Sequence, residues 1–263
     1  RGIARGDRVA IWAPNGLRWI TAVLGLWEAG AAVVPVNTRF KGAEAADVLR
    51  RSGARALVTV TDFLGVDHAA MLHDEDLPGL DVVTGHLAEL HAGPEALREV
   101  ARRSTVVGTD DLADILYTSG TTGRPKGVMQ THGRTLCVAR DWVAMTGLRR
   151  GDRYLMVNPY FHMFGLKAGI LASIAAGATM YPEPTFDVER ALRRIQDDHI
   201  TVLPGAPTLY QGLLDAPGRD RYDLSSLRVA VTGAADIPVS LVHRIREELP
   251  FEVVVTGYGL TEA

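Results

Sequence analysis

The chain has 263 residues, of which 47% are hydrophobic and 22% are charged. This length and composition exclude bulk disorder and are typical of a globular protein with a sizeable core. The 28 basic and 31 acidic side chains give a net charge of −3, which excludes the basic surface of a dedicated nucleic-acid binder. The single cysteine, Cys137, cannot form an internal disulfide, so we expect a reducing, cytoplasmic compartment.

The apolar runs of the sequence are too short to cross a membrane. None approaches the ~20 residues that span a bilayer, and the most apolar stretch, residues 21–36, is interrupted by Glu28 and by glycines. The chain begins without a methionine and stops abruptly after Glu262 and Ala263. We therefore expect no integral membrane segment, and a chain truncated at both ends of a longer protein.

Short β-branched runs alternate with amphipathic stretches along almost the whole sequence. The first part predicts strands at residues 9–13, 32–36 and 56–60, and helices at about 16–29 and 43–51. Residues 62–109 are less regular. After them, the pattern predicts strands at 114–117, 153–157, 178–181, 200–204, 227–232 and 252–256, and helices at about 131–145, 166–176, 187–198, 207–215 and 238–249.

Continuous apolar strands separated by helices favour parallel sheets that are covered on both faces. We therefore predict an α/β fold with two parallel-sheet lobes. The first lobe covers residues 1–105 and the second covers residues 106–263, with the junction near residues 103–110.

A glycine-rich segment follows the strand predicted at 114–117. It reads Tyr117-Thr-Ser-Gly-Thr-Thr-Gly-Arg-Pro-Lys-Gly127. Backbone N–H groups, hydroxyls and one ammonium group suit the oxygens of a polyphosphate. It is not a Walker A loop, because Pro125 stands five positions after Gly120, where that motif needs its second glycine. The alternative is a strand–helix connection whose Ser and Thr residues only form turns.

Three further segments are weak signals when each is taken alone. They are Asn158-Pro-Tyr-Phe-His162, Thr232-Gly-Ala-Ala235 and Gly257-Tyr-Gly-Leu-Thr-Glu262. A lone histidine such as His162 is more often structural than catalytic. The last segment does not fit a dinucleotide-binding fingerprint, because Glu262 replaces its third glycine.

Together, the four segments resemble the motifs of the adenylate-forming enzymes, which include acyl-CoA synthetases, nonribosomal adenylation domains and luciferases. The resemblance covers essentially the whole chain but only the large N-terminal domain of a typical member. It implies that a C-terminal domain with the catalytic lysine is absent, since none of Lys41, Lys126 and Lys167 matches it. We therefore expect this chain alone to be nearly inactive.

The resemblance implies that a carboxylate attacks the α-phosphorus of ATP, and that the thiol of coenzyme A then displaces AMP. It assigns the β- and γ-phosphates to Thr118, Ser119, Gly120, Thr121, Thr122, Gly123 and Lys126. Mg²⁺, which prefers oxygen ligands, is assigned to Thr118 and Glu262. The adenine is assigned to Tyr258 on one face and to Gly233, Ala234 and Ala235 on the other, with Gly257 and Gly259 beside it and Thr261 on the α-phosphate.

The acyl side of the implied site is less specific. His162, with Tyr160 and Phe161, would line the passage between the acyl pocket and the thiol tunnel. The resemblance adds His162 to Thr118, Lys126 and Glu262 as a catalytic residue. Phe164, Gly165 and Lys167 would form the mouth of the pocket, and residues 204–207 a neighbouring wall. Plain core packing explains this aromatic cluster about as well.

The sequence around these segments is more similar to bacterial acyl-CoA ligases than to peptide-synthetase domains. It is most similar to the branch that joins CoA to the indane-dione propanoate left from steroid rings C and D. Medium-chain fatty or aryl acids are alternative substrates. An adenylation domain that loads a carrier protein and a non-catalytic nucleotide-binding module are alternative functions, and a homodimer is left open.

Overall fold

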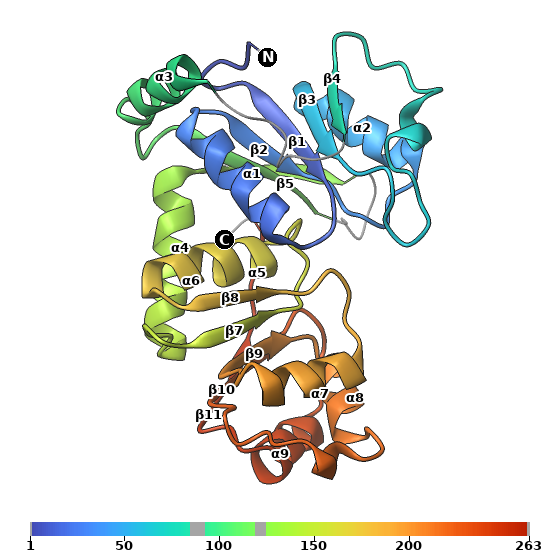
Figure 1. Ribbon diagram of the computed structural model, residues 1–263, viewed down its shortest axis with the longest axis vertical. Helices are drawn as coiled ribbons and strands as arrows, with labels where there is room; N and C mark the ends of the chain where they lie inside the picture. Colours follow the sequence, from blue (N-terminus) through green and yellow to red (C-terminus); the bar gives the residue numbers. More distant parts are fainter. Residues whose placement is uncertain (1, 85–92, 119–124, 262–263) are drawn as a thin grey trace. The chain divides into compact units, whose positions relative to one another are not determined.

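The computed structural model describes residues 2–84, 93–118 and 125–261, and Figure 1 shows their helices and strands. Contacts between Cα atoms divide the chain into two compact units. The first unit comprises Arg1–Cys137 and Phe161–Met163, and the second comprises Val138–Tyr160 and Phe164–Ala263. Each unit contains one sheet, so the predicted α/β fold with two sheet lobes is confirmed.

The first unit is built on a six-stranded sheet with the strand order β4-β3-β1-β2-β5-β6. The strands are β1 (Arg8–Trp12), β2 (Ala32–Pro35), β3 (Ala54–Thr59), β4 (Asp81–Thr84), β5 (Leu112–Thr118) and β6 (Lys126–Thr131). Adjacent strands are parallel except β5 and β6, which are antiparallel. Its helices are α1 (Leu17–Glu28), α2 (Gly42–Ser52), α3 (Pro94–Ser104) and the 3₁₀ turn Ala70–Leu72.

The alternating side chains of β1 face two separate cores in the first unit. Val9 belongs to a cluster against which Leu26 of α1 packs. Ala10 and Trp12 belong to another cluster, which contains Leu49 of α2. Because neighbouring residues of a strand point to opposite faces, α1 and α2 cover opposite faces of this sheet.

The second unit contains a five-stranded sheet with the order β11-β10-β9-β7-β8, in which all neighbours are parallel. The strands are β7 (Arg153–Met156), β8 (Thr179–Pro182), β9 (Val202–Gly205), β10 (Val229–Gly233) and β11 (Val253–Gly257). The helices are α4 (His132–Thr146), which begins in the first unit, α5 (Met163–Gly165), the π-helix Leu166–Leu171, α6 (Ala172–Ala176), α7 (Val188–Asp197), α8 (Pro207–Leu214) and α9 (Val239–Glu248). The 3₁₀ turn Arg219–Arg221 follows α8.

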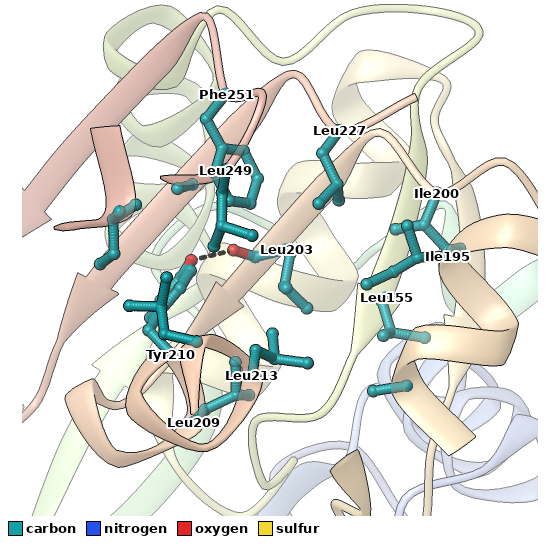
Figure 2. Packing of buried hydrophobic residues seen from close by; sticks show 14 of the residues in the cluster. Leu155, Ile195, Ile200, Leu203, Leu209, Tyr210, Leu213, Leu227, Leu249 and Phe251 are labelled. Atoms are coloured by element: carbon teal, nitrogen blue, oxygen red, sulfur yellow. Dashed lines mark hydrogen bonds between the residues drawn. The ribbon is translucent and has the colours of Figure 1, made fainter. Parts of the chain in front are cut away.

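Leucine, isoleucine and aromatic side chains from α7, α8, α9 and the strands between them form the main core of the second unit (Figure 2). Tyr210 of α8 is fully buried in it. Its hydroxyl donates to the carbonyl oxygen of Leu203 in β9 and accepts from the N–H of Val231 in β10, at 3.1 Å. A buried phenol usually has a hydrogen-bond partner, because leaving a buried hydroxyl unsatisfied is costly. Tyr210 therefore ties α8 to two neighbouring strands.

The structure contains elements that the periodicity does not predict. β4 and α3 lie within residues 62–109, and β6 lies between the glycine-rich segment and α4. β4 has four residues, which is too short for a clear alternating pattern. The division of the chain also differs from the predicted boundary at 105/106, because β5 and β6 complete the sheet of the first unit.

No helix in the described part of the chain is long and apolar enough to cross a bilayer.

Candidate active site

The glycine-rich segment connects two antiparallel strands. β5 ends at Thr118 and β6 begins at Lys126, and these two residues are register partners. The predicted polyphosphate ligands Ser119, Gly120, Thr121, Thr122 and Gly123 lie outside the described residues. The alternative interpretation, a connection from a strand to a helix, was therefore wrong. The segment joins the two strands of a hairpin, and α4 begins only after β6.

The side chain of Lys126 is exposed and makes no ion pair with the described residues.

The residue after Lys126 is Gly127, and the hairpin leaves little room for a side chain at this position. A Cβ at Gly127 would lie 3.0 Å from Cγ2 of Ile115 and 3.2 Å from Cζ of Tyr117. The close approach of the backbone to β5 fixes the register that sets Lys126 opposite Thr118.

The adenine-side segment and the Tyr-Gly segment lie at the ends of neighbouring strands. Gly233 is the last residue of β10, Gly257 is the last residue of β11, and the two are register partners. A Cβ on Gly233 would lie 2.4 Å from the carbonyl oxygen of Gly257. The structure thus brings together two predicted segments that are separated by more than twenty residues in the sequence.

The residues after these two strands lie at the surface. Ala234 and Ala235 are exposed, and Ala234 has a φ of 64°, which is rare for a residue with a Cβ. Tyr258 is 90% exposed, so its ring is accessible to a ligand. Gly259 and Thr261 follow it. Glu262, the predicted magnesium ligand, lies outside the described residues.

These features lie at the carboxyl end of the second sheet. In open α/β sheets, ligands bind outside the carboxyl ends of parallel strands. The predicted adenine site occupies such a position, because it consists of the residues that directly follow β10 and β11. The topology of the second unit is therefore compatible with the nucleotide site predicted from the sequence.

The aromatic–histidine segment contributes to both units. Tyr160 belongs to the second unit and is 1% exposed; its hydroxyl contacts Sδ of Met156 at 3.6 Å. Burial raises the pKa of this phenol well above its usual range. Phe161 and His162 belong to the first unit. The side chain of His162 is exposed, although desolvation by the surrounding protein lowers the pKa of its imidazole.

The predicted mouth of the acyl pocket follows β7 within the second unit. Phe164 is half-buried, whereas Gly165 and Lys167 are buried. Lys167 is therefore not an exposed mouth residue. It lies in the π-helix Leu166–Leu171, all of whose residues are buried. π-Helical turns occur frequently at functional sites, and helical spacing in the sequence does not distinguish them from an α-helix.

The predicted wall at residues 204–207 joins β9 to α8. Pro204, Gly205 and Pro207 are buried. A Cβ on Gly205 would lie 2.6 Å from Cδ1 of Leu209, so the chain turns tightly against α8 at this strand end. This segment is therefore packed into the core of the unit on its helix side.

The described ranges contain no group of three or more His, Cys, Asp or Glu side chains that could hold a metal ion together. A metal site with three such protein ligands is thus not formed there. An ion held by one or two protein oxygens and by substrate phosphates needs no such cluster.

Comparison with known proteins gives a consistent assignment over the whole chain. The profile of the family described as AMP-binding enzyme matches residues 1–263. The 7a-methyl-1,5-dioxo-octahydro-1H-inden-4-yl propanoyl:CoA ligase of Mycobacterium tuberculosis is 50% identical, over 100% of this chain and 54% of that protein. The chain spans about half the length of the curated relatives it matches.

Two solved structures support the same assignment. The N-terminal domain of FACL13 from Mycobacterium tuberculosis matches with a TM-score of 0.82 and 29% identity, over 99% of this chain and 64% of that one. The anthranilate CoA ligase AuaEII, solved in complex with anthranoyl-AMP, matches with a TM-score of 0.82 and 26% identity, over 99% of this chain and 51% of that one. From the profile match over all 263 residues, together with these likenesses in sequence and fold, we conclude that the chain belongs to the AMP-binding enzyme family.

Proposed function

We propose that the complete gene product containing this chain is an ATP-dependent acyl-CoA ligase that activates a bicyclic propanoate. The observation that carries the proposal is the 50% identity, over the whole chain, to a ligase named for the propanoyl:CoA of a methyl-dioxo-octahydroindene. The carboxylate would attack the α-phosphorus of ATP and release pyrophosphate. Coenzyme A would then attack the acyl carbon and release AMP.

The proposed adenine site follows the ends of β10 and β11 in the second unit. Tyr258 offers an exposed aromatic face for the adenine, and Gly233, Ala234 and Ala235 offer backbone beside it. Thr261 would donate to the α-phosphate. Gly257 and Gly259 keep side chains away from the space between the adenine and the phosphates.

The proposed polyphosphate site depends on the hairpin between β5 and β6. Lys126 is a free cation among the described residues, and its register places it opposite Thr118. With Ser119, Gly120, Thr121, Thr122 and Gly123, it would hold the β- and γ-phosphates. Positioning a cation where negative charge develops is a large contribution to phosphoryl and nucleotidyl transfer.

Thr118 and Glu262 carry the oxygen donors that Mg²⁺ prefers, and Thr118 ends β5 at the start of the phosphate segment. Magnesium would neutralise phosphate charge when bound. His162 is exposed, and its lowered pKa favours the neutral imidazole. It would therefore line the passage to the thiol without adding a fixed charge at neutral pH.

Two further proposals concern the protein as a whole. A cytoplasmic location is supported by the single cysteine, Cys137, which is free and exposed on α4. A homodimer remains a prediction.

The test is a coupled assay with the complete gene product, ATP, Mg²⁺, coenzyme A and the indane-dione propanoate. Pyrophosphate exchange without coenzyme A would report the first half-reaction, and the thioester would be identified by its mass. Medium-chain fatty acids and aryl acids are the comparison substrates. ATP binding without pyrophosphate exchange for any acid would contradict the proposal and favour the nucleotide-binding module. Transfer to a carrier protein but not to coenzyme A would favour the adenylation domain.

A further inference from the structure

Trp142 of α4 is held in one orientation by contacts at three sides of its ring. Its indole lies near the hydroxyl of Tyr154, a fully buried residue of β7. That hydroxyl donates to the carbonyl oxygen of Ala168, at 3.0 Å, in the π-helix. Phe164 packs against the indole edge to face, with 5.5 Å between ring centroids and an interplanar angle of 68°. These contacts all lie within the second unit.

The opposite edge of the same indole reaches the end of β11. A Cβ on Gly257 would lie 3.9 Å from Cζ3 and 4.0 Å from Cη2 of Trp142. Gly257 directly precedes Tyr258, and ligands of parallel sheets bind outside such strand ends. Trp142 therefore lies between Phe164, in the segment after β7, and Gly257, the last residue of β11.

The indole remains half-buried although three of its sides are occupied. A half-buried ring that packs edge to face against Phe164 presents a rigid apolar face, because rotation of the indole would lose this contact. This arrangement suits recognition of an apolar body of fixed size better than it suits a flexible chain of variable length.

We propose that Trp142 is a specificity-determining residue that limits how long the apolar part of the carboxylic acid can be. The inference rests on the proposed acyl-CoA ligase function and names its substrate class: short, rigid, ring-containing acids. The indole fills the space between Phe164 and Gly257. A long flexible chain would need that space, whereas a bicyclic propanoate would end against the ring.

The experiment compares two acids in the complete gene product, the indane-dione propanoate and palmitate. The measured quantity is kcat/KM for pyrophosphate release, and the selectivity is the ratio of the two values. Trp142→Ala is expected to lower this ratio at least ~10-fold, because one methylene in an apolar pocket already changes selectivity by roughly 10- to 200-fold. Trp142→Phe, which retains an aromatic ring but shortens it, is expected to lower the ratio by a smaller factor.

Two further variants separate a specificity role from a structural one. Tyr154→Phe removes the hydroxyl near the indole but leaves Trp142 in place, so it is expected to reduce the ratio less than Trp142→Ala. Trp27→Phe is the matched control. Trp27 is also anchored, by an N–H bond of 2.8 Å to the carbonyl oxygen of Ala113 and by an edge contact with His132, but it lies in the first unit. Its substitution is expected to leave the ratio unchanged.

An unchanged ratio in both Trp142 variants would overturn the inference, and so would an equal loss of kcat/KM for both acids. If Trp142→Ala does not fold, as judged by circular dichroism, Trp142→Phe decides the outcome. The proposed function fails separately: a wild-type protein that activates no carboxylic acid refutes it, and the inference falls with it. An active wild type with unchanged selectivity in the variants refutes the inference alone.

Discussion

The close approach of β10 and β11 makes Gly233 the most sharply constrained position beside the proposed nucleotide site. A Cβ at this residue would stand 2.4 Å from the carbonyl oxygen of Gly257, whereas real Cβ atoms essentially never come within 3.0 Å of another heavy atom. In Gly233→Ala, one strand must move by about 0.6 Å, as the difference between these distances requires. The neighbouring register pair Thr232–Thr256 opposes this shift.

Overpacking a well-packed region typically costs about 1–3 kcal/mol, and we expect Gly233→Ala to lower the free energy of unfolding by that amount. Gly25→Ala is the matched control. Gly25 lies inside α1, and a Cβ there would meet nothing within 4 Å. Replacing a helical glycine with alanine is expected to stabilise the protein by about 0.5–1 kcal/mol. Gly233→Ala should therefore lower the free energy of unfolding, whereas Gly25→Ala should raise it.

The assay is urea unfolding of the wild type and both variants, followed by far-ultraviolet circular dichroism. AMP affinity, measured by calorimetry, provides a second readout, because the displaced strands end in the proposed adenine site. Gly233→Ala should weaken AMP binding, whereas Gly25→Ala should not. A Gly233→Ala variant with wild-type stability and wild-type AMP affinity would refute the reasoning from the glycine contact.

Three other variants test individual side chains. Lys126→Ala in the complete gene product should raise the barrier to adenylation by about 2.7–4 kcal/mol with little change in melting temperature, as expected for loss of one preorganised donor; unchanged pyrophosphate exchange would exclude the phosphate role. Glu262→Gln should lower activity and raise the Mg²⁺ concentration needed for half-maximal rate; a wild-type magnesium titration would leave Glu262 without a metal role. His68 is buried and stacked on Trp12 at 4.4 Å, and desolvation lowers its pKa below 6.5. The unfolded chain therefore binds the proton first as pH falls, so the stability that His68 contributes is lost below about pH 6.5. His68→Phe should make the stability in urea less sensitive to a fall in pH below about 6.5. An unaltered pH dependence would contradict a lowered pKa of His68 in the folded protein.

The sequence by itself determined the fold class and the enzyme family. Apolar strands and amphipathic helices alternate, and this local pattern follows directly from the periodicity of the side chains. The predicted strands at 9–13, 32–36, 227–232 and 252–256 overlap those of the structure because each contains a short run of apolar residues. The glycine-rich segment was recognisable because a string of small, hydroxyl and basic residues is itself unusual.

Only the tertiary structure decided which of these elements are neighbours. The pairing of β5 with β6 depends on a register that aligns Thr118 with Lys126, and strand pairing is not encoded in the periodicity of either strand alone. Likewise, Gly233 and Gly257 meet because β10 and β11 are adjacent in the sheet. Trp142 carries no motif, and its contacts with Tyr154, Phe164 and Gly257 arise from packing between distant segments. Local patterns specify elements, whereas the choice of neighbours depends on the burial of side chains across the whole unit.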